Sequence, residues 1–527
     1  MARRLNWIAL AALLVAGITA LVFLIRAGDP GATNWPIHFE LRSSDNGVLF
    51  QFAQDVFAGR PLDWSFSPQV FVFPEIPISL LGYLLAGGTV QLYYLMVACI
   101  NVVLLFLGLF AVIRYLFATQ TLPRRLLRAG LCVFPLVFLP LVGTTWLFEY
   151  QLAPTYYYGM YLMILVAPIM FFGCSRWVKI ALGVGIALTA ASNPLALVFV
   201  IPALVCVLIV RMIAGGLRSV ARPALWSAAA ILLAFLIRIL FFGPLQGTSP
   251  LTYVSTLLFQ GRIVSLEYYI RGMAGNWTTA IVLYLGTGLL VAGFVIAIII
   301  AVKVVRGTQP NRARQAAWMY YALVPITGLA GTAVLLITEY LYLWPILILP
   351  IVLAFLPLPR KLVPFFAAAA VIALVVVGSI TGGAANLARV PTYFAYRSPE
   401  TQCLDSKLPA GMTVGYSTFS DARRIELTSD RHILLIQLKS NGVRAYWLTN
   451  RDYARDNVGR FFYINANGDE PPISVSFLEK NFGIPDSSFS CAPGEKVLIY
   501  TTPSKLAKIK ARYSTLPPPG ESLAKLR

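Results

Sequence analysis

Residues 277–314, WTTAIVLYLGTGLLVAGFVIAIIIAVKVVRGTQPNRAR, show the pattern on which the fold of this chain depends. The first part, residues 277–302, carries no charged side chain. As a helix it is long enough to cross the roughly 30 Å hydrocarbon core of a bilayer. The part that follows holds four basic residues and no acidic one. An apolar run followed by a short basic segment is typical of a membrane span that ends on the cytoplasmic side.

The same alternation of apolar runs and polar breaks extends through most of the 527 residues. The chain is 58% hydrophobic and only 12% charged, whereas soluble proteins are about 45–50% apolar and about 25% charged. We therefore predict a mostly α-helical, polytopic membrane protein with a soluble α/β domain at its C-terminus. At roughly 20 residues per crossing, about eleven transmembrane helices are expected, at residues 5–25, 91–115, 129–148, 157–174, 178–192, 194–214, 223–243, 277–302, 316–337, 340–357 and 362–382.

The first apolar run, Leu5 to Ile25, follows Arg3 and Arg4 and could also be a secretory leader. It is longer than the apolar part of most leaders, and many further apolar runs come after it. No small-residue cleavage site follows it cleanly. We predict that it is the first membrane span.

The distribution of basic residues predicts the orientation. The net charge of +20 would suggest a nucleic-acid partner in a soluble protein. Here, however, six breaks between apolar runs hold 17 basic residues and no acidic one: Arg3/Arg4, Arg114/Arg124/Arg125/Arg128, Arg176/Lys179, Arg211/Arg218/Arg222, Lys303/Arg306/Arg312/Arg314 and Arg360/Lys361. Because short loops rich in Lys and Arg stay cytoplasmic, we place the N-terminus inside and residues 383–527 outside. This pattern argues against a nucleic-acid partner.

One apolar segment, Val70 to Gly88, is predicted not to cross the membrane. Counting it as a span would place the basic cluster at residues 114–128 outside. The segment also contains Pro74, Pro77 and Glu75. We therefore expect residues 27–90 to form one long outer loop that includes helices at the membrane surface.

The chain divides into a transmembrane domain, residues 1–382, and an outer-face domain, residues 383–527, with a basic, Pro-rich tail. Short β-type runs at residues 432–438, 444–448, 461–464 and 496–501 indicate an α/β fold for the second domain. Cys403 and Cys491 are its only cysteines, and in an oxidising compartment a disulfide between them is expected. With two histidines and no CxxC pair in the chain, we expect no metal site.

The candidate catalytic residue is Asp45, in the stretch HFELRSSDNGVLFQFAQDVFAGRP at residues 38–61. One interpretation is structural, with Asp45 as the N-cap of an amphipathic helix that Gly59 ends. The other is functional. A carboxylate held at a helix start near the membrane surface is well placed to take a proton from a hydroxyl group.

These residues resemble the GT-C superfamily of membrane glycosyltransferases, which use polyprenyl-phosphate-linked sugars. The resemblance lies in an N-terminal span, an outer-loop Asp about 20 residues later, a helix ending in Gly-x-Pro at residues 59–61, and Pro74-x-x-Pro77. The segment from Glu339 through Pro345 to Pro350 is similar to a late span of many members. Many members carry an acidic pair in the outer loop, but Asn46 follows Asp45 here.

The resemblance implies a metal-independent, inverting transferase in a bacterial inner membrane, with Asp45 as the base. It implies a polyprenyl-phosphate sugar as donor, no separate cofactor, and an envelope glycan, lipid or protein as acceptor. Arg238 lies near the outer end of span 223–243, where a charge is costly, so we expect it to bind the leaving phosphate or to reach the interface. Arg262 and Arg271 are candidates for the same phosphate or for lipid headgroups.

Glu339, Tyr340, Tyr342 and Asp55 are possible substrate contacts. The tyrosines could equally form an aromatic belt at the interface, and Asp55 could be a solvated residue. Two other functions remain open. One is a transporter or flippase for a lipid-linked glycan, for which paired broken helices or inverted repeats would be expected. The other is an assembly or sensor protein that uses the outer domain for recognition.

Overall fold

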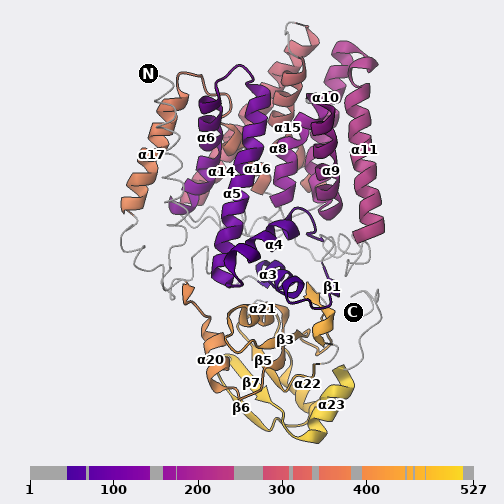
Figure 1. Ribbon diagram of the computed structural model, residues 1–527, viewed down its shortest axis with the longest axis vertical. Coiled ribbons are helices and arrows are strands. Elements are labelled where there is room, and N and C mark those ends of the chain that lie inside the picture. Colours follow the sequence, from indigo (N-terminus) through magenta and orange to yellow (C-terminus); the bar gives the residue numbers. More distant parts are fainter. Residues whose placement is uncertain are drawn as a thin grey trace.

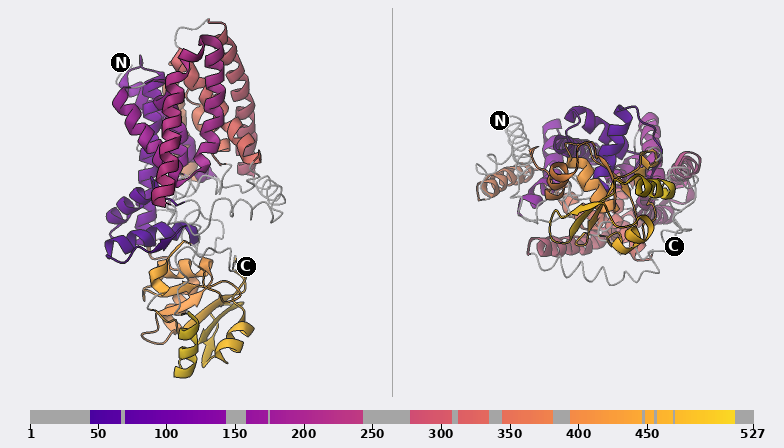
Figure 2. Two further views of the ribbon diagram at one scale, coloured as in Figure 1. Left: turned by 90° about the vertical axis from the view of Figure 1, so that its right-hand side faces the viewer. Right: turned by 90° about the horizontal axis from the view of Figure 1, so that it is seen from below.

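The computed structural model describes residues 44–66, 70–142, 158–173, 175–242, 277–307, 312–334, 344–380, 394–445, 448–454, 457–468 and 470–513. Within these residues the chain is mostly helical, with some sheet. A bundle of long helices forms one end of the molecule, and an α/β unit forms the other (Figure 1). Figure 2 shows the same division from the side and the α/β unit beneath the end of the bundle.

The bundle consists of helices that follow the predicted apolar runs. They are α5 (Val90–Leu116), α6 (Leu122–Val142), α8 (Tyr158–Phe172), α9 (Arg176–Ser192), α10 (Leu195–Gly215), α11 (Ala221–Ile237), α14 (Trp277–Val305), α15 (Arg312–Val334), α16 (Trp344–Leu353) and α17 (Val363–Ile380). Most of them run along the long axis of the molecule (Figure 1). The predicted first span, residues 5–25, lies outside the described residues.

Four of the described helices are long and apolar enough to cross a membrane: Val90–Leu116, Leu195–Gly215, Ala221–Phe242 and Tyr284–Val305. They carry large apolar side chains on the outer surface of the bundle. Leu232 and Phe235 of α11, for example, are 59% and 61% exposed. Exposure of so large an apolar surface to water is energetically unfavourable, whereas exposure to lipid is not. The outer surface of these helices is therefore compatible with a membrane.

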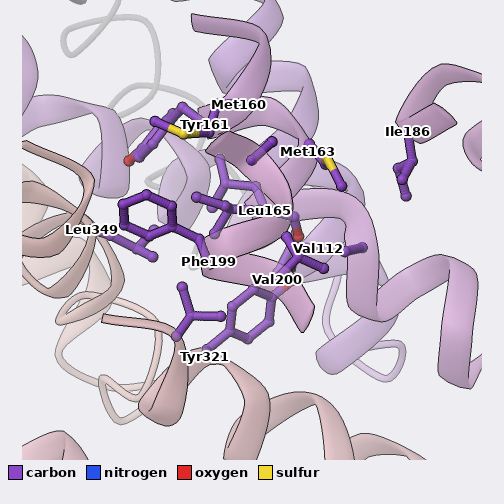
Figure 3. Close-up of a cluster of buried hydrophobic side chains, with 14 of the residues drawn as sticks. Val112, Met160, Tyr161, Met163, Leu165, Ile186, Phe199, Val200, Tyr321 and Leu349 are labelled. Atoms are coloured by element: carbon purple, nitrogen blue, oxygen red, sulfur yellow. Dashed lines mark hydrogen bonds between the residues drawn. The ribbon is translucent and has the colours of Figure 1, made fainter. Parts of the chain in front are cut away.

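The core of the bundle is built around α8, in which nearly every side chain is buried. Figure 3 shows side chains of α5, α9, α10, α15 and α16 converging on it. Tyr321 of α15 donates a hydrogen bond to the backbone oxygen of Leu165 at 2.6 Å. Helices α10 and α15 pack closely at Gly328 of α15. A Cβ atom added there would lie 2.4 Å from the Phe199 ring of α10, so the absence of a side chain permits the contact. Small residues allow this close approach in membrane bundles.

Helices α3 (Ser44–Phe57) and α4 (Glu75–Ala86) run across the end of the bundle, between it and the α/β unit (Figure 1). At 1.5 Å per residue, α4 is about 18 Å long, which is too short to cross a bilayer core of roughly 30 Å. The Ser79 hydroxyl of α4 donates to the backbone oxygen of Leu49 in α3 at 2.8 Å and lies 2.7 Å from the Tyr93 hydroxyl of α5. These contacts connect both surface helices to the bundle.

The α/β unit contains a five-stranded sheet in the order β3-β2-β5-β7-β6. Its strands are β2 (Val414–Ser417), β3 (Leu434–Gln437), β5 (Phe461–Asn465), β6 (Ser487–Phe489) and β7 (Glu495–Ile499). Strands β2, β3 and β5 are parallel, and β7 is antiparallel to β5 and β6. The helices that accompany the sheet are α20 (Pro399–Lys407), α21 (Phe419–Thr428), α22 (Val475–Phe482) and α23 (Pro503–Tyr513).

A disulfide joins Cys403 of α20 to Cys491 in the connection between β6 and β7. This is the pairing that the sequence analysis predicts. The two residues are 88 positions apart, and the crosslink therefore restricts most of the unit when it is unfolded. Of the strand predicted at residues 444–448, Arg444 makes an isolated antiparallel bridge to Leu438, and residues 446–447 lie outside the described residues.

Candidate functional site

The loop predicted to lie outside, residues 27–90, and the α/β unit are joined through the buried carboxylate of Asp55. It accepts hydrogen bonds from Trp64 Nε1 at 3.0 Å, Asn450 Nδ2 at 2.8 Å and the Tyr453 hydroxyl at 2.7 Å. Trp64 and Asn450 share Oδ2, whereas Arg60 lies 3.3 Å from Oδ1, the oxygen that Tyr453 contacts. Both oxygens are thus occupied, and the side chain is fully buried. This geometry gives Asp55, a predicted substrate contact, a structural role instead.

A short sheet continues the same junction. Strand β1 (Trp64–Ser65) pairs antiparallel with β4 (Thr449–Asn450), although the two lie far apart in the sequence. Next to it, Arg451 Nε donates to the Asp63 carboxylate at 3.0 Å, and the Arg451 amide donates to the Asp63 backbone oxygen at 2.8 Å. The loop after α3 therefore has one defined position against the α/β unit.

Helix α21 packs directly on α3. Gln51 donates to the Glu426 carboxylate at 2.7 Å, and Arg423 pairs with the same carboxylate at 2.9 Å. A Cβ atom added at Gly47 would lie 2.6 Å from Leu427, so the two helices approach closely. Burial raises the pKa of Glu426, and the neighbouring Arg423 opposes that rise. The α/β unit thus positions the helix that begins beside Asp45.

The backbone of Asp45 lies in the first turn of α3, because the helix begins at Ser44. Asp45 is therefore the second residue of the helix and not the N-cap that the sequence predicted. The side chain of Asp45 lies outside the described part of the structure. At its other end α3 stops at Phe57, and Gly59 adopts a positive φ of 65° in the turn that follows.

Glu75, the first residue of α4, is a carboxylate that the sequence analysis did not identify as a site residue. Its Oε1 accepts a hydrogen bond from the Gly159 amide at the start of α8, at 3.0 Å. Its Oε2 is buried and has no hydrogen-bond partner among the described residues. Burial raises the pKa of Glu75 to about 7, although the Gly159 hydrogen bond opposes the rise. The sequence signal that could have identified Glu75 was its position as an acidic residue within an apolar segment.

Arg238 lies where α11 widens into η2, a π-helical turn at Arg238–Phe242. Such turns are rare and often occur at functional sites. Arg238 Nη1 donates to the backbone oxygen of Ala191 at 2.7 Å, so the half-buried side chain points toward the end of α9. The next residue, Ser192, accepts a hydrogen bond from the Phe73 amide at 2.9 Å. Arg238 and the segment that leads into Glu75 therefore meet at the end of α9.

The same end of the bundle carries the start of α3. The Ser79–Leu49 hydrogen bond connects α4 to α3. Ser79 is four residues after Glu75, and Leu49 is four residues after Asp45, so each acidic position is about 6 Å along its helix from this contact. The structure thus places Glu75, Arg238 and the backbone at Asp45 at the same end of the bundle.

The remaining predicted site residues, Arg262, Arg271, Glu339, Tyr340 and Tyr342, lie outside the described residues. In the part of the chain that is described, no three His, Cys, Asp or Glu side chains are grouped as a metal site would require. No protein-family model, curated protein or solved structure matches the chain. The proposal that follows therefore depends on the sequence and on the geometry at this end of the bundle.

Proposed function

We propose that the protein is a GT-C-type glycosyltransferase of a bacterial inner membrane. It would move a sugar from a polyprenyl-phosphate donor to an envelope acceptor, a glycan, lipid or protein. In this proposal about eleven spans cross the membrane, the N-terminus is cytoplasmic, and the α/β unit is a soluble domain on the outer face.

Contacts between distant loops support the proposed topology. The segments expected outside meet at the end of the bundle next to the α/β unit, as the Glu75–Gly159 and Phe73–Ser192 hydrogen bonds illustrate. A second set of contacts joins segments expected inside. Arg128 donates to the backbone oxygen of Leu358 at 2.8 Å. Each set contains only segments that the basic-residue pattern assigns to one side of the membrane.

A further contact of the second set joins Arg360 to the Thr119 hydroxyl at 3.2 Å. It connects the break before α17 with the break between α5 and α6, two segments that are both expected inside. The arrangement of α4 is also consistent with this topology, because it lies across the bundle end instead of along it (Figure 1).

The observation that carries the functional proposal is that a guanidinium and two acidic positions lie at the same end of the bundle, the end that this topology places outside. Inverting sugar transfer needs a base for the acceptor and a cation for the leaving group. Asp45 would accept the proton of an acceptor hydroxyl while that oxygen attacks the anomeric carbon. The bond from this carbon to the phosphate oxygen breaks, and the electron pair leaves with the polyprenyl phosphate. Arg238 would stabilise the resulting phosphate charge with its planar N–H donors.

Glu75 fits this scheme as a second acid of the site. A carboxyl with a pKa of about 7 carries a proton on a large fraction of molecules at neutral pH. It therefore adds little negative charge where the phosphate of the donor would have to bind. An ordinary carboxylate at this position would repel that phosphate.

The substitution Asp45→Asn tests the proposal. Asn has nearly the same shape as Asp, and the loss of one charge in the first turn of a helix costs only about 0.3–1 kcal/mol, so the fold should be retained. Because Asn cannot accept the proton, we expect at least about a hundredfold loss of transfer rate. The rate is measured as release of polyprenyl phosphate from a panel of polyprenyl-phosphate sugars in membrane vesicles. Asp430→Asn, at a side chain that is 73% exposed, is the matched control.

Transfer at the parent rate by a folded Asp45→Asn protein would refute the proposed function. Movement of the intact lipid-linked sugar across the same vesicles, without release of polyprenyl phosphate, would support the transporter alternative instead.

A further inference from the structure

A cavity of about 440 Å³ lies in the α/β unit, away from the site at the bundle end. It opens at the carboxyl edge of the parallel strands. Its lining comes from the chain after β2, after β3 and after β5, and includes Thr418, Phe419, Leu438, Lys439, Ser440 and Glu470. None of these residues takes part in the proposed transfer step.

The position of the cavity is the one at which open α/β sheets bind ligands. After β2 the chain forms α21 and returns as β3 on one side of β2, whereas β5 lies on the other side. The connections therefore diverge above β2, and a crevice forms outside the carboxyl ends of the strands. A volume within the roughly 300–1,000 Å³ range of ligand sites, with apolar walls and few polar groups, fits such a use.

The charges around the cavity disfavour an anionic ligand. The first turn of α21 would ordinarily attract an anion through its free amides. Here Glu470 already fills that role, because its carboxylate accepts a hydrogen bond from the Ser420 amide at 3.1 Å. Lys439 and Glu470 leave the described lining without net charge, and a phosphate at the start of α21 would meet the Glu470 carboxylate, so the cavity favours ligands that are uncharged.

The polar groups suit a ligand with many hydroxyl groups. The Glu470 carboxylate can accept hydrogen bonds, Lys439 is a donor, and the Ser440 hydroxyl can do both. The half-buried Phe419 ring and Leu438 provide an apolar surface for the C–H face of a ring. A saccharide combines these two kinds of surface, whereas a purely apolar ligand would leave the polar groups unsatisfied.

We propose that this cavity binds a saccharide and that this saccharide is the acceptor of the transfer; the second part rests on the proposed function. Helix α21 connects the two sites, because its first residue, Phe419, lines the cavity and Leu427, near its end, touches Gly47 of α3. Ten residues of helix span about 15 Å. An oligosaccharide held in the cavity therefore has a short distance to cover to reach the helix that carries Asp45.

Saturation-transfer NMR on the full-length protein in detergent tests the binding. The probes are maltose, chitobiose and α-linked disaccharides of mannose, galactose and arabinose, each at millimolar concentration. We expect at least one to bind the parent protein and to bind Glu470→Gln at least tenfold more weakly. Glu479→Gln, an exposed position on α22, should bind like the parent. Inorganic phosphate should not displace the sugar.

Three results would overturn the saccharide site: no binding by any probe, displacement by phosphate, or unchanged binding in both Glu470→Gln and Phe419→Leu. The acceptor role is tested separately by transfer rates. Unchanged transfer in Glu470→Gln, with transfer lost in Asp45→Asn, would overturn that role alone. Because the described lining of the cavity belongs to the α/β unit, Asp45→Asn should bind the sugar like the parent, so failure of the transferase proposal is seen independently.

Discussion

The buried carboxyl of Glu75 should make the stability of this protein depend on pH in a direction opposite to that of most acidic residues. Its pKa in the folded protein is about 7, whereas the ordinary value for Glu is 4.5. Between these two values the folded state binds more protons than the unfolded state. The free energy of unfolding must therefore fall as the pH rises from 4.5 to 7, and it should level off above pH 7.

The size of the effect follows from the two pKa values. A difference of one pKa unit corresponds to about 1.4 kcal/mol, so the change from 4.5 to about 7 is worth about 3 kcal/mol. The physical cause is the loss of water around the carboxylate. The single hydrogen bond from Gly159 to Oε1 offsets only part of that loss.

The measurement compares the parent with Glu75→Gln by thermal unfolding in detergent between pH 4.5 and pH 8. Gln keeps the shape and can still accept from Gly159, but it has no proton to release. We expect the parent to lose about 3 kcal/mol relative to the variant across this range. Other titrating groups are common to both proteins and cancel in the difference. Glu479→Gln, at an exposed position, should show no such difference.

A constant difference between parent and Glu75→Gln at every pH would refute this reasoning. It would mean that the Glu75 carboxyl is hydrated in the folded protein and that its pKa is not raised toward 7.

Three further predictions concern the junction, the phosphate and the topology. Asp55→Asn leaves one accepting oxygen where the carboxylate has two, each facing donors, so we expect the free energy of unfolding to fall by about 1–3 kcal/mol, with faster proteolysis between the bundle and the α/β unit; parent-like resistance would contradict it. Arg238→Lys should weaken donor use roughly tenfold, because Lys cannot form the bidentate pair; an unchanged donor affinity would count against phosphate binding. Single cysteines at the exposed positions Leu85 and Leu122 should label from opposite sides of the membrane, and labelling of both from one side would exclude the topology.

The sequence by itself determined the features that depend on local composition. Runs such as residues 194–214, whose one charged residue is Arg211 near the end, predicted α10 closely, because apolar residues over this length satisfy their backbone hydrogen bonds only as a helix in lipid. The strands at residues 461–464 and 496–501 were likewise predicted, since β5 and β7 overlap them. The Cys403–Cys491 pairing followed from there being only two candidates in the domain.

The roles of the acidic residues were decided only by the tertiary structure. Asp55 was predicted as a possible substrate contact, but Asn450, a donor 395 residues further along the chain, helps to bury it in a structural junction. In the sequence Glu75 is only an acidic residue within an apolar segment. The tertiary structure shows that the start of α8 packs against its carboxyl. Hydropathy and spacing are properties of neighbouring residues, whereas the charge state and role of a carboxyl depend on the donors and water around it. Those surroundings come from segments that the sequence does not place together.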